Sequence, residues 1–139
     1  MDSSRELLDA AIAARAGAYA PYSHFTVGAA LLDDDGRVWT GANIENASYG
    51  LSMCAERTAI FHAVASGAHR FRAVAVTGPD GTTTLPCGAC RQVLWEFGPA
   101  MRVIYDDGGR LVETPLAELL PSAFGPEQLA GAQARERPR

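Results

Sequence analysis

Hydrophobic residues recur with helical spacing near the start of the chain. The spacing has a period of about 3.6 residues. The positions are Leu7, Leu8, Ala11 and Ile12, followed by Arg15, whose aliphatic part continues the stripe. Ser4 can cap such a helix, and Gly17 can end it. The pattern predicts a first amphipathic helix over residues 4–17.

Apolar runs of strand length follow this helix. Residues 25–32 and 37–41 flank an Asp-Asp-Asp-Gly turn, which predicts a β-hairpin. Further strands are expected at 72–77, 102–105 and, at an edge, 111–113. Residues 72–77 are apolar at nearly every position, which is typical of a central strand.

The remaining apolar segments have the spacing of helices. They are expected at residues 54–66, 87–98, 116–120 and 127–133. The apolar positions of the helix at 54–66 are expected to be Ala55, Ala59, Phe61, Val64 and Ala65. Alternating helices and strands predict an α/β fold in which helices cover both faces of a layered sheet. We expect a single domain over residues 1–132 and a disordered tail at 133–139.

The composition narrows the functional classes. The 139-residue chain has a net charge of −4, so a nucleic-acid backbone is not an expected partner. No segment is long and apolar enough to cross a membrane, and the N-terminus has no signal-peptide pattern. Three cysteines cannot all pair within one chain, which favours reduced thiols and a cytoplasmic location.

The cysteines occur in two short motifs that together indicate one metal site. Cys54 opens the run Cys-Ala-Glu-Arg, and Cys87 and Cys90 stand in Pro-Cys-Gly-Ala-Cys-Arg. Both motifs begin predicted helices, where the partial positive charge of the N-terminus favours thiolates. Three thiolates can hold zinc and leave a fourth position for water, whose proton Glu56 can take. This is the arrangement of a hydrolytic zinc enzyme.

Two arginines follow the cysteines at helical spacing. Three thiolates and Zn²⁺ leave a charge of −1, which weakens the metal as an acid toward its bound water. Arg57 is three residues after Cys54, and Arg91 is four residues after Cys87, so each shares a helical face with a sulfur. We expect both arginines to donate hydrogen bonds to thiolates.

Three other interpretations of the cysteines remain open. Cys87 and Cys90 alone have the spacing of a redox pair, but this leaves Cys54 and Glu56 without a role. A structural zinc needs a fourth ligand. The candidates for that ligand are His24, His62 and His69. Small buried cysteines are also common, but burial alone does not explain the neighbouring Pro, Glu and Arg.

Five collinear stretches extend the two motifs, at residues 20–31, 41–49, 54–59, 87–92 and 119–124. Through them the chain resembles the zinc-dependent cytidine deaminases of the small, all-cysteine type, from about residue 7 to residue 129. The resemblance implies a three-layer α/β/α sandwich around a mixed five-stranded sheet. It also implies one zinc ion per chain and a homotetramer whose active sites are shared between subunits.

The resemblance further implies a reaction. It is the hydrolytic deamination of cytidine and 2′-deoxycytidine to the uridines and ammonia, a step of pyrimidine salvage. Zinc-bound hydroxide attacks C4 of the ring, and Glu56 moves protons to N3 and to the leaving amino group.

Contacts with the nucleoside are implied in the same way. Asn43 and Glu45 resemble the residues that grip the ribose 3′-hydroxyl, and Phe25 the aromatic that packs on the pyrimidine. Without the family, we would interpret the first two as loop caps and the third as a core residue.

Other implied contacts come from a neighbouring subunit or from the backbone. Tyr49 resembles a residue near the ribose and the subunit interface, and Phe124 one that closes a neighbour's pocket. The amide of Ala55 and the carbonyl of Pro86 correspond to groups that face the edge of the base.

Three alternative functions are kept beside this one. A deaminase of another aminopyrimidine, such as blasticidin S, would share the metal motifs but is expected to lack the segment from Asn43 to Asn46. A zinc-stabilised binding module would leave the near-UV spectrum of cytidine unchanged. A nucleic-acid editor is disfavoured by the small size, the acidic charge and the lack of a basic channel.

Overall fold

The computed structural model describes residues 3–130. Five strands form a sheet in the order β2-β1-β3-β4-β5. They are β1 (Gly28–Asp33), β2 (Val38–Ala42), β3 (Phe71–Thr77), β4 (Arg102–Asp107) and β5 (Arg110–Pro115). Neighbours β3 and β4 run parallel, and the other neighbours run antiparallel. The sheet is therefore mixed, as the resemblance implies.

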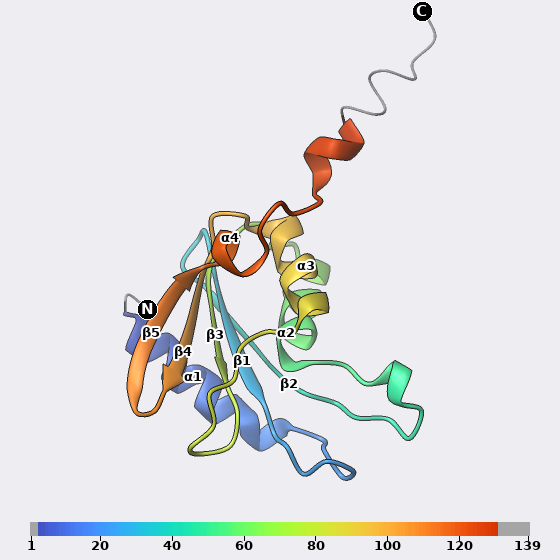
Figure 1. The fold of residues 1–139 in the computed structure, drawn as a ribbon, viewed down its shortest axis with the longest axis vertical. Coiled ribbons are helices and arrows are strands. Elements are labelled where there is room, and N and C mark those ends of the chain that lie inside the picture. The colour runs from blue at the N-terminus through green and yellow to red at the C-terminus, as the bar shows by residue number, and fades with distance from the viewer. Residues whose placement is uncertain (1–2, 131–139) are drawn as a thin grey trace, which may run out of the picture.

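Helices cover both faces of this sheet (Figure 1). Helix α1 (Ser4–Ala14) lies on one face and packs on a cluster that includes Ala30, Ala73, Ala75 and Ile104. Helices α2 (Ala55–Ala65) and α3 (Gly88–Phe97) lie over the larger core on the other face, with the short helix α4 (Leu116–Leu119) beside them. The expected three-layer α/β/α sandwich is confirmed.

The start and end of the first helix differ from the prediction. Ser3 caps α1, because its Oγ accepts a hydrogen bond from the Glu6 amide at 3.0 Å. Ser4 instead lies inside the helix, and its Oγ donates to Glu113 Oε1 on β5 at 2.8 Å. The last predicted turn, Arg15–Gly17, is a 3₁₀ helix.

Helix α2 presents a different apolar face from the one predicted. Phe61 is 46% exposed and Ala65 is also exposed, whereas Ile60 and Ala63 are fully buried together with Ala59. The buried residues face the sheet because α2 packs along β1 and β2. Apolar residues occur on several faces of this helix, so the sequence shows no clear apolar stripe.

Gly41 allows α2 to lie close to the sheet. A Cβ atom at this position of β2 would lie 2.5 Å from the backbone nitrogen of Ala59 and 2.7 Å from the carbonyl oxygen of Ala55. Both atoms belong to the first turns of α2, so a side chain at Gly41 would push away the end of the helix that follows Cys54.

Strand β1 begins at Gly28, three residues later than predicted. The preceding segment is held by Asn43 instead of by a sheet neighbour. The Asn43 Oδ1 accepts from the Val27 amide at 2.8 Å, and its Nδ2 donates to the Phe25 carbonyl at 2.8 Å. The first residues of the predicted strand thus run beside the end of β2 as a loop.

The structure describes only part of the C-terminal segment for which a helix and a tail are predicted. Residues 126–130 are helical, so the helix begins one residue before the one predicted at 127–133. The disordered tail predicted at 133–139 lies outside the described residues. Among residues 3–130, no helix combines the length and the apolar character needed to span a bilayer.

Asp33 is a buried carboxylate that fixes the turn between β1 and β2. It is 2% exposed and accepts hydrogen bonds of 2.9–3.3 Å from the amides of Asp35 and Arg37, from Arg37 Nε and from Trp39 Nε1. Burial alone would raise the pKa of Asp33, but the bonds from Trp39, Arg37 and Asp35 outweigh it and keep the pKa below its usual value.

Replacing Asp33 with alanine should lower the free energy of unfolding by about 2–3 kcal/mol, because several donors lose a charged acceptor. In the wild type, the depressed pKa means that this stabilisation is present above the usual pKa of 3.8 and is lost as the pH falls through the lower, folded-state pKa. Urea unfolding at pH 7 and at about pH 3 measures both effects. Asp35→Ala, which removes an exposed neighbouring carboxylate, is the control, and an equal loss in both variants would contradict the assignment.

Candidate zinc and substrate site

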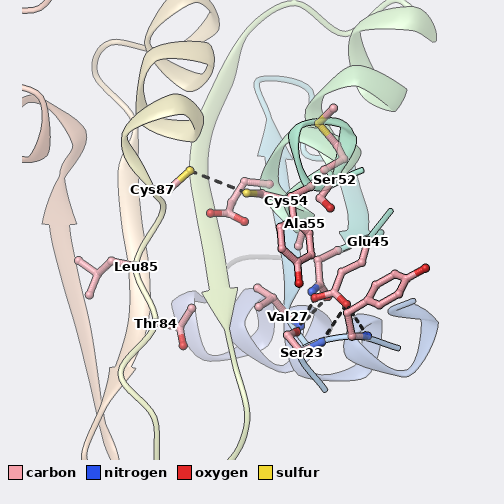
Figure 2. Close-up of a pocket in the computed structure, with 14 residues that line it drawn as sticks. Ser23, Val27, Glu45, Ser52, Cys54, Ala55, Thr84, Leu85 and Cys87 are labelled. Atoms are coloured by element: carbon pink, nitrogen blue, oxygen red, sulfur yellow. Dashed lines mark hydrogen bonds between the residues drawn. The ribbon is translucent and has the colours of Figure 1, made fainter. Parts of the chain in front are cut away.

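The three cysteines lie at the N-termini of two neighbouring helices. Cys54 is the N-cap residue of α2, Cys87 is the N-cap residue of α3, and Cys90 lies in the first turn of α3. Both N-cap residues have extended backbone conformations, which turn the chain out of the helix and bring the sulfurs together (Figure 2). The predicted motifs therefore meet at one point.

The spacing of the sulfurs fits a zinc ion. Ligands at about 2.3 Å from a tetrahedral zinc lie about 3.8 Å from one another. The Sγ–Sγ distance is 3.8 Å between Cys54 and Cys87 and 3.5 Å between Cys87 and Cys90, and all three sulfurs lie within 4.8 Å of one another. The thiols are free, so they can bind a cation together. The presence of Cys54 beside the pair also favours a metal site over a two-cysteine redox site.

A fourth protein ligand is not provided within residues 3–130. The cluster that could hold a metal consists of the three cysteines alone. All three histidines are exposed, and the His62 ring packs edge-on against Trp39 with the ring centroids 5.5 Å apart. One coordination position is thus left for water, as a hydrolytic site requires and a structural zinc site does not.

One of the clustered thiols ionises easily, and its charge makes ionisation of a second thiol unfavourable. Hydrogen bonding with Cys90 and with Arg57 lowers the pKa of Cys54 to about 5. The same interaction with Cys54, together with burial, raises the pKa of Cys90. A divalent cation would remove this conflict, because it stabilises every thiolate that binds it.

Arg57 supplies the positive charge that was predicted for it. Its Nη2 donates to Cys54 Sγ at 3.4 Å. Its Nε is buried and has no hydrogen-bond acceptor within the described residues. A half-buried cation with an unused, buried donor fits a site whose sulfurs are all ionised, which is the state that zinc produces.

Arg91 does not have the role predicted for it. Its Nε donates to the Pro86 carbonyl at 2.7 Å, and its Nη1 donates to the Leu119 carbonyl at 2.9 Å. Helical spacing predicts that Arg91 shares a face with Cys87, but the guanidinium group bonds instead to the end of α4 and to the residue before Cys87. Arg91 thus ties the chain before α3 to the C-terminal part of the fold.

Glu56 lies in the first turn of α2 and is 3% exposed. Burial raises the pKa of Glu56 to about 7, and the neighbouring Cys54 adds to the effect. A carboxyl group with a pKa near neutrality can both accept and return a proton. Its place beside the sulfurs agrees with the predicted proton carrier.

A cavity of about 370 Å³ opens beside the sulfurs (Figure 2). Its volume lies in the range of about 300–1,000 Å³ that small-molecule sites have. Cys54, Glu56 and Cys87 lie at one end. The rest of the lining consists of Tyr22, Ser23, Val27, Asn43, Glu45, Tyr49, Ser52, Met53, Ala55, Thr84 and Leu85.

Four of the predicted substrate residues line this cavity, and two do not. Asn43, Glu45, Tyr49 and Ala55 belong to the lining. Phe25 and Phe124 lie outside it and are 41% and 56% exposed. The carbonyl of Phe124 accepts from Gln92 Nε2 at 2.8 Å, which holds this residue against α3.

The Glu45 carboxylate is held by hydrogen bonds from the loop that contains Tyr22 and Ser23. It accepts hydrogen bonds from Ser23 Oγ and from the amides of Tyr22 and Ser23. The hydrogen bond from Ser23 lowers the pKa of Glu45. The carboxylate is thus held as an acceptor in the cavity wall, and this loop-capping role coexists with its place in the cavity.

Sequence reasoning missed the opposite wall of the cavity. Thr84 and Leu85 lie in the loop between β3 and α3, directly before Pro86 and Cys87. Their position just before Cys87 and Cys90 in the sequence could have indicated that they line the site. Ser23 was likewise not assigned, although it stands inside the stretch that carries the resemblance.

Arg57→Gln should weaken zinc binding by about 10- to 100-fold, because the thiolates lose their charged donor. Competition between the protein and a chelator of known zinc affinity measures the change. Arg91→Gln is the matched control, since Arg91 donates to carbonyls and its loss should affect zinc binding much less. Equal zinc affinities for wild type and Arg57→Gln would contradict the role given to Arg57.

Comparison with known proteins identifies the family. A model of the cytidine and deoxycytidylate deaminase zinc-binding region matches residues 1–106. The cytidine deaminase of Halalkalibacterium halodurans is 52% identical over 125 residues, covering 88% of this chain and 95% of that protein. The Mycobacterium tuberculosis cytidine deaminase is 48% identical over 116 residues, covering 84% and 85%.

A solved structure has the same fold over nearly the same length. The crystal structure of cytidine deaminase from Burkholderia pseudomallei superposes with a TM-score of 0.83 at 51% identity, covering 88% of this chain and 99% of that one. Sequence match, shared fold and a three-sulfur site with an adjacent buried glutamate agree with one another. The chain belongs to the zinc-binding cytidine and deoxycytidylate deaminase family.

Proposed function

We propose that this protein hydrolyses cytidine and 2′-deoxycytidine to uridine and 2′-deoxyuridine, with release of ammonia. The observation that carries the proposal is the position of Glu56, which is buried beside three clustered sulfurs at one end of a nucleoside-sized cavity. Similarity to proteins named cytidine deaminases supports the choice of substrate. The three free thiols also support a reducing, cytoplasmic location.

Cys54, Cys87 and Cys90 would hold the zinc ion, and Arg57 would offset their charge. When bound, zinc lowers the pKa of a coordinated water, so that a nucleophile is available near neutral pH. The protein groups around it must then orient the base and move the protons.

Glu56 is the proton carrier of the proposed reaction. Its carboxylate takes a proton from the attacking water and gives it to N3 of the pyrimidine, which makes C4 more electrophilic. After the C4–O bond forms, Glu56 moves the remaining hydroxyl proton to the amino nitrogen. The C4–N bond then breaks, ammonia leaves, and a carbonyl remains at C4. Burial supports this role, because water would otherwise exchange these protons freely.

We propose that two backbone groups beside the sulfurs orient the base. The amide of Ala55 stands at the N-terminus of α2, and Ala55 lines the cavity. The Pro86 carbonyl accepts from Arg91 Nε and keeps a second lone pair, which can accept from the amino group of the substrate. Arg91 thereby orients a substrate contact, a function that sequence spacing did not indicate.

The other end of the cavity is suited to a sugar. The Glu45 carboxylate and the Asn43 carboxamide line it, and both can accept from a ribose hydroxyl beyond the bonds they already make. Tyr49 lies in the same wall. We propose that Phe25 packs on the pyrimidine from the edge of this region.

We also propose a homotetramer in which neighbouring subunits complete each site. Phe124 is 56% exposed, Tyr49 is 78% exposed and Leu51 is 68% exposed, which is costly for large apolar surfaces in water. Contact with a neighbour would bury them and would bring Phe124 to a cavity that its own chain does not let it reach.

Glu56→Gln should lower kcat by at least about 10³-fold while zinc remains bound, because the amide cannot carry a proton. The decrease of near-UV absorbance as cytidine becomes uridine measures activity, and elemental analysis measures zinc. Cys87→Ala is the companion variant and should lose both zinc and activity. Normal turnover by Glu56→Gln, or full activity in protein free of metal, would refute the mechanism.

A panel of cytosine nucleosides, the free base, nucleotides and blasticidin S separates the proposed substrate from its rivals. A flat spectrum with every compound would indicate a binding module. Activity restricted to single-stranded nucleic acid would indicate an editor.

Phe124→Ala should raise KM for cytidine about tenfold without loss of zinc, since the side chain is proposed to close a neighbour's cavity. Light scattering of the eluted protein should give a mass near four chains for wild type. Ile12→Ala, which removes a 45% exposed apolar side chain from α1 on the other face of the sheet, is the control. An unchanged KM in Phe124→Ala would exclude the residue from the substrate site.

A further inference from the structure

Three consecutive threonines in the loop between β3 and α3 have different environments. Thr84 lines the cavity, and Thr82 is half-buried behind it. Thr83 is exposed and points the other way, where its Oγ1 donates to Asp107 Oδ1 at 3.1 Å. The loop therefore has one threonine in the cavity lining and two neighbouring threonines outside it.

The hydrogen bonds of Thr82 fix the direction of the Thr84 hydroxyl. Thr82 Oγ1 lies 2.6 Å from the Pro79 carbonyl oxygen, which can only accept, so Thr82 uses its single proton there. The contact of 3.2 Å between Thr82 Oγ1 and Thr84 Oγ1 then requires Thr84 to be the donor. With its proton used, Thr84 can offer the cavity only lone pairs.

The hydroxyls of Thr82 and Thr84 lie so close to Gly78 that there is no room for a side chain at this position. A Cβ atom at Gly78 would lie 2.3 Å from Thr84 Oγ1 and 2.9 Å from Thr82 Oγ1. It would also lie 3.3 Å from Cε1 of Phe25. The absence of a side chain at Gly78, directly after β3, thus lets the loop fold back over this position.

Thr84 lies at the sugar end of the cavity. Along the wall formed by this loop, Cys87 stands nearest the other sulfurs, followed by Leu85 and then Thr84 (Figure 2). Ser23 and Glu45 belong to the opposite wall. A nucleoside whose base points to the sulfurs would have its sugar between Thr84 and Glu45.

We propose that Thr84 is a specificity-determining residue that accepts a hydrogen bond from a sugar hydroxyl of the nucleoside, and that Thr82 positions it. A cytosine nucleoside carries two kinds of donor, its amino group and its sugar hydroxyls. The amino group must lie at the metal end to react, so a hydroxyl is the donor that meets Thr84. This inference rests on the proposed function.

The test compares Thr84→Val with Thr84→Ser and Thr83→Val in the zinc-loaded enzyme. Valine keeps the shape of threonine but has no acceptor, so KM for cytidine should rise about tenfold while kcat is unchanged. Thr84→Ser should restore the wild-type KM. Thr83→Val, which removes a hydroxyl from the outer side of the same loop, should have no effect.

Cytidine analogues that lack the 2′-, 3′- or 5′-hydroxyl identify the bonded group. For one of the three analogues, Thr84→Val and wild type should have equal KM, because the partner of the missing acceptor is also missing. Thr82→Val should raise KM less than Thr84→Val does, and it should add nothing in the double variant.

Two results would overturn the proposal. One is a KM for cytidine that is the same in Thr84→Val as in wild type. The other is an equal rise in KM for cytidine and for all three analogues. If wild-type enzyme produced no uridine from cytidine, the proposed function itself would fail, so the two failures are distinguishable.

Discussion

The meeting of two helix N-termini on one side of the sheet is the constraint on which the site depends. Cys54 and Cys87 are both N-cap residues, so the sulfurs stand where helix ends offer unpaired amides and partial positive charge. Helix α2 reaches this point because Gly41 lets it lie close to β2, and α3 reaches it through the loop that follows β3. Gly41 therefore contributes to the position of the sulfurs through the packing of α2.

Two buried carboxylates in this fold have pKa values that are shifted in opposite directions. Asp33 receives four hydrogen bonds, and its pKa is lowered, so its charge stabilises a turn. Glu56 is just as buried, but burial dominates and raises its pKa to about 7. The first carboxylate therefore keeps its charge at ordinary pH values, whereas the second has a pKa near neutrality, as the proposed role of proton carrier requires.

Sequence reasoning succeeded where chemistry is local and failed where it depends on distant partners. The order of strands and helices and the clustering of the three sulfurs follow from short motifs and from periodicity. The burial of Glu56 agrees with its predicted role, which stays a prediction. The role of Arg91 did not follow, because its acceptor on Leu119 belongs to a segment 28 residues away. The exposed Phe61 and the buried Ile60 were confused because α2 carries apolar residues on several faces. The contacts of Phe124 with a neighbouring subunit are still a prediction.

The cavity is assembled from two separate pieces of chain, and this division has an evolutionary consequence. One wall comes from residues 22–56, and the other from residues 84–87. The second piece lies in a loop whose outer threonine is tied to β4. Substitutions in this loop can alter the fit of a ligand while the sheet, the glutamate and the first cysteine remain unchanged. Under the proposed function, small changes in this one short connection would therefore change substrate preference without a change in the scaffold.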